Sequence, residues 1–455
     1  MSNLSKAITF AHAHQQESLE QLKALLRIPS VSTLPEHEED ITRAATWIAE
    51  KLGALGFTNV ELLPTNRHPV VVGEWLKAGV DAPTILVYGH YDVQPVDPID
   101  EWESDPFDPQ IRGENLYARG ASDMKGQIVA HLLAMQAMLE TGGMPINIKY
   151  MVEGEEEIGS PNLKAFIEAE RDRLTCDLCL NADSGILAED QPALTVALRG
   201  LAYFELQLHG QRSDLHSGMF GGAVDNPGMV LSTLLAGMKD DQGRIKLPGF
   251  YDDVIPLTEK ERALMQDLSD EWWLEHAGAK VLHSESGYSA SESACARPTL
   301  DINGLLCGFT GEGSKTVLPA RAMAKFSMRL VPNQSTEKIR QSVETYLEEA
   351  MPPTMTYELI EHASSPPATI EPDSPALEAA ARALEEVWGQ QVVFDRQGGT
   401  VPVVALIQEL LGIDSLMLGF GLPSDNIHGP NEKQHIPTFY RGIETFIRFA
   451  FAING

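Results

Sequence analysis

Hydrophobic residues are spaced in two different ways over the first half of the chain. Helical spacing, with apolar residues three or four positions apart, runs over residues 9–27, 40–55 and 124–141, and Gly142 and Gly143 close the last of these segments. Continuous apolar runs, which are typical of strands buried on both faces, occupy residues 69–75, 84–89, 146–152 and 178–182. This alternation predicts an α/β domain with a mostly parallel central sheet.

The pattern changes near Arg199. The segment LAYFELQLHG (201–210) alternates large apolar and polar residues, as a half-exposed strand does. Residues 243–300 are irregular and rich in Gly, Pro, Ser and charge. The other elements predicted here are strands at 300–310, 323–331 and 354–361 and helices at 226–240 and 335–350. Together they predict a small α+β unit with an open sheet.

The α/β pattern returns after a Pro- and Ser-rich hinge at residues 362–375. The elements predicted beyond the hinge are helices at 376–388, 402–411 and 437–452 and strands at 391–395 and 415–418. We therefore predict one α/β domain, formed by residues 1–198 and 370–455, that is interrupted by an inserted α+β domain at residues 199–369.

The amino-acid composition limits the kinds of molecule that the protein is expected to bind. The 455 residues include 34 Lys and Arg against 65 Asp and Glu, a formal net charge of −31. So acidic a surface disfavours nucleic acids and anionic membranes. No apolar run reaches the length of about 18 residues that a membrane-spanning helix needs, and the first residues lack the apolar core of a signal peptide. We expect a cytoplasmic protein that binds neither nucleic acid nor membrane.

The four cysteines are too few for a disulfide framework in a chain of this length. Cys176 and Cys179 form a CxxC pair, which fits half of a zinc knuckle, a redox pair or two core residues at the start of the strand TCDLCL. Cys295 and Cys307 do not repeat the spacing. We therefore interpret the pair as core cysteines.

Five short segments with acidic residues or histidines stand at strand exits or at a helix entrance. They are GHYDVQP (89–95), ARGASDMKG (118–126), EGEEEIGS (153–160), NADSG (181–185) and HGPNEKQHIP (428–437). Each alone has an ordinary interpretation, such as a surface loop, a helix-capping aspartate or a solvated acidic turn. However, ligands of α/β sheets bind outside the carboxyl ends of the strands, where these segments are predicted to lie.

Taken together, the segments provide a candidate ligand set of two histidines and three carboxylates in one predicted domain. Such a set holds two divalent metal ions when one carboxylate bridges them. Imidazole and carboxylate ligands favour zinc, with manganese or cobalt as alternatives. Three adjacent glutamates at 155–157 repel one another unless a cation lies among them. The functional interpretation makes one of them a metal ligand and its neighbour a general base.

In this order, the segments HYDVQP, RGASDMKG, EGEEEIGS, NADSG and HGPNEK resemble the signature segments of the co-catalytic zinc metallopeptidases. That family includes aminoacylase, acetylornithine deacetylase, succinyl-diaminopimelate desuccinylase, carboxypeptidase G and the carnosinase-like dipeptidases. The resemblance covers nearly the whole chain. It implies that His90 and Asp183 bind one metal ion, that Glu157 and His428 bind the other, and that Asp123 bridges both.

The resemblance also assigns the remaining groups of the catalytic domain. It implies that Asp92 orients the ring of His90 and that Glu156 is the general base, which takes a proton from the attacking water and returns it to the leaving amine. The family pair of glutamates lies just before an x-Gly-Ser sequence, which here is Gly159-Ser160. This register selects Glu156 and Glu157 and leaves Glu155 without a catalytic role.

For the inserted domain, the resemblance implies a lid that also forms a homodimer. His216, in DLHSGMFGG, would reach the partner subunit's active site and stabilise the oxyanion. Arg329, in MRLVPNQ, would bind the substrate carboxylate. Thr316, Gly399 and Thr400 would be further substrate contacts. From the residues alone, a turn histidine and a surface arginine are the ordinary alternatives for the first two.

The expected activity is hydrolysis of an amide bond in a dipeptide or small peptide with a free C-terminal carboxylate. The segments around Thr316, Arg329 and Gly399 resemble the dipeptidase branch of the family more than the deacylases. Two alternatives stay open. One is an N-acyl-amino-acid deacylase with the same metals and base, and the other is a catalytically inactive protein that binds an amino acid or peptide. The presence of Glu156 and of every expected ligand argues against the inactive protein.

Overall fold

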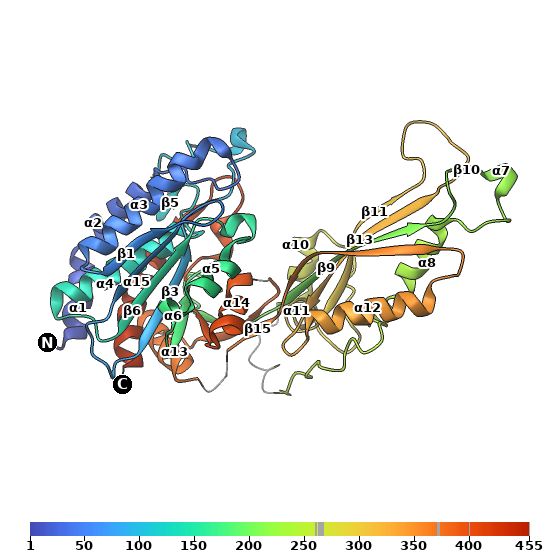
Figure 1. The fold of residues 1–455 in the computed structure, drawn as a ribbon. Helices are drawn as coiled ribbons and strands as arrows, with labels where there is room; N and C mark the ends of the chain where they lie inside the picture. The colour runs from blue at the N-terminus through green and yellow to red at the C-terminus, as the bar shows by residue number, and fades with distance from the viewer. Residues whose placement is uncertain (260–261, 263–267, 371–373, 400, 455) are drawn as a thin grey trace. The chain divides into compact units, whose positions relative to one another are not determined.

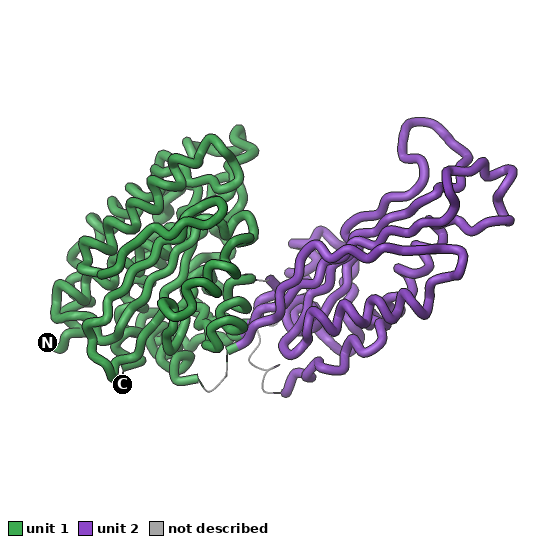
Figure 2. Tube along the Cα trace, viewed as in Figure 1, with its two compact units in different colours: residues 1–196, 370–395, 402–455 green, residues 197–369, 396–401 purple. Residues whose placement is uncertain are grey.

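The computed structural model describes residues 1–259, 262, 268–370, 374–399 and 401–454. The chain forms two compact units, which Figure 2 shows in different colours. Unit 1 consists of Met1–Val196, Ile370–Asp395 and Pro402–Gly455, and unit 2 of Ala197–Thr369 and Arg396–Val401. The chain therefore leaves unit 1 after Val196, builds most of unit 2, returns at Ile370 and contributes a second short segment, residues 396–401, to unit 2.

A large sheet forms the centre of unit 1 (Figure 1), in the order β1-β2-β6-β3-β7-β17-β8-β15, with β16 also paired to β8. The pairings β6–β3, β3–β7 and β7–β17 are parallel, whereas the β1–β2, β2–β6, β17–β8 and β8–β15 pairings are antiparallel. The α/β class is confirmed, and the parallel pairings described here join the four central strands. The strands are β1 (Thr58–Leu63), β2 (Val70–Trp75), β3 (Thr84–His90), β6 (Asn147–Glu153), β7 (Leu178–Asn181), β8 (Ala193–Leu198), β15 (Ala368–Thr369), β16 (Val393–Gln397) and β17 (Ser415–Met417).

Helices of unit 1 pack in two groups around this sheet. Helix α4 contacts β3 and is surrounded by α1, α2 and α15, which is why almost every residue from Lys125 to Met138 is buried. Helix α14 packs with α5, α6 and β17. The helices are α1 (Asn3–Ala13), α2 (Gln15–Leu26), α3 (Glu38–Ala54), α4 (Lys125–Thr141), α5 (Leu163–Ala169), α6 (Arg171–Leu174), α13 (Pro375–Trp388), α14 (Pro402–Leu411) and α15 (Ile436–Ile453).

The helix predicted at residues 9–27 is two helices. The backbone leaves the helical region at His14, with φ −112° and ψ 20°, so α1 ends at Ala13 and α2 begins at Gln15. The His14 ring Nδ1 lies 2.8 Å from the Phe10 carbonyl oxygen, inside the last turn of α1. The apolar spacing runs through this break, so the sequence pattern did not reveal it.

Unit 2 is an antiparallel sheet in the order β11-β13-β9-β14 with helices on one face (Figure 1). Helices α8 and α12 cover the face formed by Phe204, Leu206 and Phe326, and the alternate residues of β9 point away from this core. The predicted half-exposed strand is therefore confirmed. The elements are β9 (Gly200–His209), β10 (Leu215–His216), α7 (Ser217–Phe220), α8 (Pro227–Gly237), α10 (Asp270–Ala277), α11 (Ala290–Cys295), β11 (Thr299–Cys307), β12 (Val317–Leu318), β13 (Arg321–Leu330), α12 (Thr336–Ala350) and β14 (Thr356–Ser365).

Two further observations bear on the sequence predictions. Cys179 is buried in β7, Cys176 is half-buried, and both are free thiols, which agrees with the interpretation as core cysteines. Among the helices that the structure describes, none combines the length and the apolar character needed to cross a membrane.

Candidate metal centre

The predicted ligands stand at one edge of the central sheet. His90 is the last residue of β3, Asp183 lies two residues after β7, and the 3-10 helix η3 (Glu156–Ile158) follows β6. His428 lies in the loop after β17, and Asp123 lies in the loop before α4. Strands β6, β3, β7 and β17 run parallel, so their carboxyl ends meet at the same edge, where α/β sheets bind ligands.

The Asp123 carboxylate lies between the two histidines. Its Oδ1 is 3.1 Å from His90 Nε2, and its Oδ2 is 2.9 Å from His428 Nε2. His428 Nε2 is also 3.2 Å from Glu157 Oε2. Each oxygen of the Asp123 carboxylate therefore contacts one of the two imidazoles.

Two overlapping groups of side chains can each hold a metal ion. His90, Asp123 and Glu157 form one group, and His90, Glu156 and Asp183 form the other; within each group the ligand atoms all lie within 4.8 Å of one another. The grouping differs from the expected pairing in two ways: Glu157 falls with His90, and Glu156, the expected general base, falls with His90 and Asp183. The set of imidazole and carboxylate donors fits divalent ions of the zinc, manganese and cobalt type.

The side chains of the cluster shift one another's pKa values strongly. Burial raises the pKa of Glu156 to about 8 and that of Asp183 to about 7, and the neighbouring carboxylates add to both shifts. Hydrogen bonds with Asp123 and Glu157 raise the pKa of His428 to about 10. Burial opposes ionisation of Asp123, but hydrogen bonds from His428 and His90 outweigh it and lower the Asp123 pKa. A bound cation would favour the ionised form of each carboxylate.

Asp92 connects the His90 ring to the glutamate turn. Its carboxylate is fully buried and lies 3.4 Å from His90 Nδ1, and its backbone oxygen lies 3.1 Å from the same nitrogen. The two carboxylate oxygens accept the backbone N–H groups of Glu156 and Glu157, at 3.2 and 3.1 Å. Asp92 therefore touches the elements that carry three residues of the cluster.

Glu155 points away from this cluster. Its carboxylate is buried and accepts hydrogen bonds from the Thr65 hydroxyl, the His68 backbone N–H at 2.8 Å and the Asn162 amide at 2.6 Å. Glu155 therefore anchors the turn to a neighbouring loop, while Glu156 and Glu157 face the histidines.

Three residues that support the metal centre were not predicted from the sequence. Gln94 donates its amide to Glu157 Oε2 at 2.8 Å, and the buried pair of Arg119 and Glu432 lies under the loop that carries Asp123. All three lie inside the quoted segments, in HYDVQP, ARGASDMKG and HGPNEK. Their position in those segments was the one feature of the sequence that could have indicated a role. It was not enough, because a polar residue in a loop is ordinarily solvent-exposed.

The predicted residues of unit 2 fall into two places. The exposed His216 pairs with Val317 through β10 and β12, and the Thr316 carbonyl accepts the Ser217 N–H at 3.2 Å, so His216 and Thr316 are neighbours. Strand β13 begins at Arg321, shortly after β12, and Arg329 lies near its other end, where it pairs with Leu201. Gly399 is exposed next to Gly398, and Thr400 lies outside the described residues.

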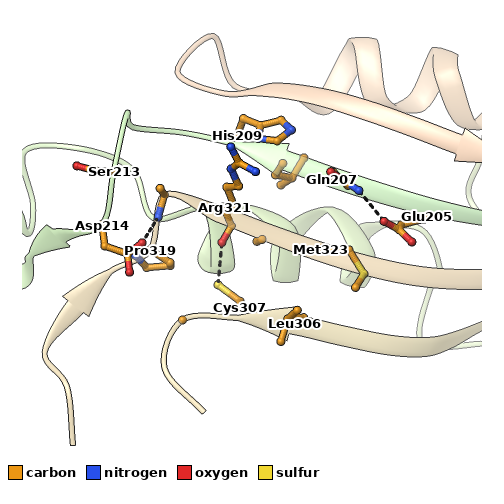
Figure 3. Close-up of a pocket in the computed structure, with 14 residues that line it drawn as sticks. Glu205, Gln207, His209, Ser213, Asp214, Leu306, Cys307, Pro319, Arg321 and Met323 are labelled. Atoms are coloured by element: carbon orange, nitrogen blue, oxygen red, sulfur yellow. Dashed lines mark hydrogen bonds between the residues drawn. The ribbon is translucent and has the colours of Figure 1, made fainter. Parts of the chain in front are cut away.

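The open face of the unit 2 sheet contains a hollow of about 560 Å³ (Figure 3). Its lining includes Glu205, Gln207, His209 and Arg321, so it combines both signs of charge. None of the ligands of the candidate metal centre lines it. We therefore place no part of the chemistry there.

Comparison with known proteins identifies the family. Residues 86–452 match the family model described as peptidase family M20/M25/M40, a range that contains all five signature segments. The chain belongs to this family. The resemblance inferred from the five segments is thereby confirmed, and with it the membership of a family of hydrolases.

Relatives within the M20/M25/M40 family match the chain over nearly its whole length. The Cys-Gly metallodipeptidase DUG1 of Candida albicans is 32% identical and the alignment covers 94% of this chain and 92% of that protein. The Beta-Ala-His dipeptidase of Homo sapiens is 32% identical, covering 98% and 92%. The crystal structure of the M20 family metallo-carboxypeptidase Sso-CP2 from Sulfolobus solfataricus superimposes with a TM-score of 0.83 at 35% identity, covering 96% and 99%.

Proposed function

We propose that this protein is a metal-dependent dipeptidase that hydrolyses the amide bond of a dipeptide or small peptide with a free C-terminal carboxylate. The observation that carries the proposal is the convergence of His90, Asp123, Glu156, Glu157, Asp183 and His428 in one cluster. Two relatives aligned over more than nine-tenths of the chain, named as dipeptidases, support the substrate class. We also propose a cytoplasmic location, which the free thiols of Cys176 and Cys179 support.

The contacts described above support the roles that we propose. Two divalent metal ions would be held by His90, Asp183, Glu157 and His428, with Asp123 as a shared ligand. Zinc is the preferred ion, and manganese and cobalt are the alternatives. Bound metal supplies a Lewis acid for the scissile carbonyl and lowers the pKa of water. Asp92 would hold the His90 ring and the backbone of the glutamate turn. Glu156 would take the proton from the attacking water and pass it to the leaving amine, as a carboxylate acting as a general base does.

We propose that Arg329 binds the substrate carboxylate, since a guanidinium can donate two parallel hydrogen bonds to it. Thr316, Gly399 and Thr400 are proposed as further substrate contacts. His216 is proposed to donate to the oxyanion that forms at the scissile carbonyl.

The substrate class is tested by product analysis on matched compounds. We expect cleavage of Cys-Gly and of β-Ala-His, and a drop in kcat/KM of about tenfold or more when the C-terminus of either is amidated, because a charge-assisted hydrogen bond is lost. Cleavage of N-acetyl amino acids alone would replace the proposal with a deacylase. Release of C-terminal residues from longer peptides alone would replace it with a carboxypeptidase. Metal binding without any cleavage would favour a binding protein.

A homodimer built through unit 2 is part of the proposal. Arg321 and Arg329 are eight residues apart on β13, about 26 Å along a strand, and His216 belongs to the Arg321 end. One small peptide cannot reach both His216 and Arg329 of the same chain. If both touch the substrate, one of them comes from a second copy. Unit 2 also exposes several large apolar side chains, as an uncovered interface would: Met219, Met229, Leu305, Leu306 and Phe309.

Subunit complementation tests the role of His216 across the dimer. The His216→Ala and Glu156→Gln proteins should each be nearly inactive, because each lacks one group at every site. Mixed dimers contain one site in which His216 and Glu156 are both intact, so mixing should restore up to about a quarter of wild-type turnover per total subunit, as random exchange makes half the dimers mixed. Exchange is verified with two affinity tags. Verified exchange without recovered turnover would contradict the role.

A further inference from the structure

The buried carboxylate of Glu432 has a full set of hydrogen-bond donors. Its Oε2 accepts from Arg119 Nη1 at 2.8 Å and from the Gly120 N–H at 2.9 Å, and its Oε1 accepts from the N–H groups of Ser122 and Asp123 at 3.0 and 3.1 Å. Glu432 is 0% exposed and Arg119 is 1% exposed. Two carboxylate oxygens offer about four acceptor sites, so Glu432 has none left for a metal ion.

The donors of Glu432 belong to the loop that presents Asp123. Three backbone N–H groups within residues 120–123 converge on one anion, an arrangement known as a nest. The last of these groups is the N–H of Asp123, whose side chain extends to both imidazoles. Arg119 fixes the other end of the loop, because its Nη2 donates to the Pro95 carbonyl at 3.0 Å.

Glu432 also belongs to the segment that carries the second histidine. It lies four residues after His428, and its own carbonyl accepts the Ala118 N–H at 3.1 Å. Directly beyond it, β18 (Lys433–His435) pairs with β5 (Asn115–Tyr117), to which β4 (Gln110–Arg112) is also paired. Side chain and backbone of Glu432 therefore join the segment of His428 to the loop of Asp123.

We infer that Glu432 is a positioning residue that holds Asp123 where its two oxygens can serve two metal ions at once. The inference rests on the proposed function. The inference distinguishes Glu432 from the metal ligands, because its carboxylate acts through Arg119 and through the backbone N–H groups of the loop that carries Asp123. Its loss should therefore weaken metal binding while every ligand remains in place.

The Glu432→Gln substitution tests this directly. Glutamine has nearly the same volume, but its NH₂ group would face two donors that now point at a carboxylate oxygen. We expect the metal-free variant, titrated with Zn²⁺ against a chromophoric chelator, to bind Zn²⁺ about 10–100-fold more weakly than wild type, the usual cost of removing a residue that orients a metal ligand. The Zn²⁺-induced rise in Tm should shrink in parallel.

Glu285→Gln is the matched control. Glu285 is also a buried carboxylate paired with an arginine, since it accepts from Arg297 Nε and Nη2 at 2.9 Å each, but it lies in unit 2. It should bind Zn²⁺ within about twofold of wild type, a difference of about 0.4 kcal/mol. Should Glu432→Gln be recovered only as aggregate, Glu432→Asp takes its place, because it keeps the charge but shortens the reach.

The outcomes separate the inference from the proposed function. Wild-type protein that binds no Zn²⁺ overturns both. Wild-type protein that binds two ions, with Glu432→Gln, or Glu432→Asp in its place, binding equally well, overturns the inference alone. An equal loss of affinity in Glu285→Gln also overturns it, because the effect would then follow from general destabilisation. Selective loss in the Glu432 variant supports it.

Discussion

The Glu156→Gln protein is expected to hydrolyse a dipeptide at least about 100-fold more slowly than wild type while it keeps its metal ions, because general-base catalysis contributes factors of about 10²–10⁴. The glutamine side chain fits the same space but cannot accept the proton of the attacking water. Glu156 lies within 4.8 Å of His90 and Asp183, close enough to be a ligand instead. The measurement therefore pairs kcat with metal content. Loss of both together would make Glu156 a ligand rather than the base.

Glu155→Gln is the control for Glu156, because it makes the same change one residue earlier. Glu155 is buried and holds Thr65, His68 and Asn162, so its replacement should lower Tm and leave kcat within a few-fold of wild type. The control also tests the register of the three adjacent glutamates. If Glu155→Gln abolished turnover and Glu156→Gln did not, the register would be shifted by one residue.

The candidate site could be predicted because its residues follow the most recognisable strands. The runs ending at Gly89, Val152 and Ala182 were found as strands buried on both faces, and the structure pairs them in parallel at the sheet centre. A residue that comes directly after such a strand has little freedom in where it lies. This is why His90 and Asp183, far apart in the sequence, were correctly expected at one sheet edge.

The remaining parts of the fold depend on contacts that a local pattern does not contain. Strand β1 has the sequence TNVELL and mostly exposed or half-buried side chains, so no apolar run marks it. The antiparallel outer pairings depend on which neighbour a strand meets, not on its own residues. For the same reason, the local sequence gives Glu432 the character of an ordinary loop residue next to His428. Only the folded loop of Asp123 supplies the donors that let its carboxylate be buried.

Metal removal should abolish activity and change how stability depends on pH. Chelation is expected to bring dipeptide turnover below detection, and Zn²⁺ or Mn²⁺ to restore it, because Asp123, Glu156, Glu157 and Asp183 lose the cations among them. Each bound metal ion should also raise the free energy of unfolding, by about 2.7 kcal/mol at a hundredfold excess over its Kd. Turnover that survives complete removal of metal, verified by elemental analysis, would contradict the whole mechanism.

The sign of the pH effect follows from the raised pKa values. Glu156 and Asp183, with pKa values of about 8 and 7 when folded, bind protons that the unfolded chain, whose carboxyls titrate near 4, has lost. Above about pH 4 these two carboxyls therefore hold more protons in the folded state, and their contribution to the unfolding free energy falls as pH rises towards 8. The pKa of His428 is raised to about 10, so this side chain also holds more protons in the folded state than in the unfolded state up to about pH 10.

The metal-free protein should accordingly lose Tm between pH 5 and pH 9, and the metal-loaded protein should lose less, because metal ions replace those protons. The net charge of −31 destabilises both forms as pH rises, so the informative quantity is the difference in Tm between them at each pH. That difference should grow with pH. A difference that stays constant, measured with metal in saturating amounts throughout, would mean that Glu156, Asp183 and His428 do not exchange protons for metal.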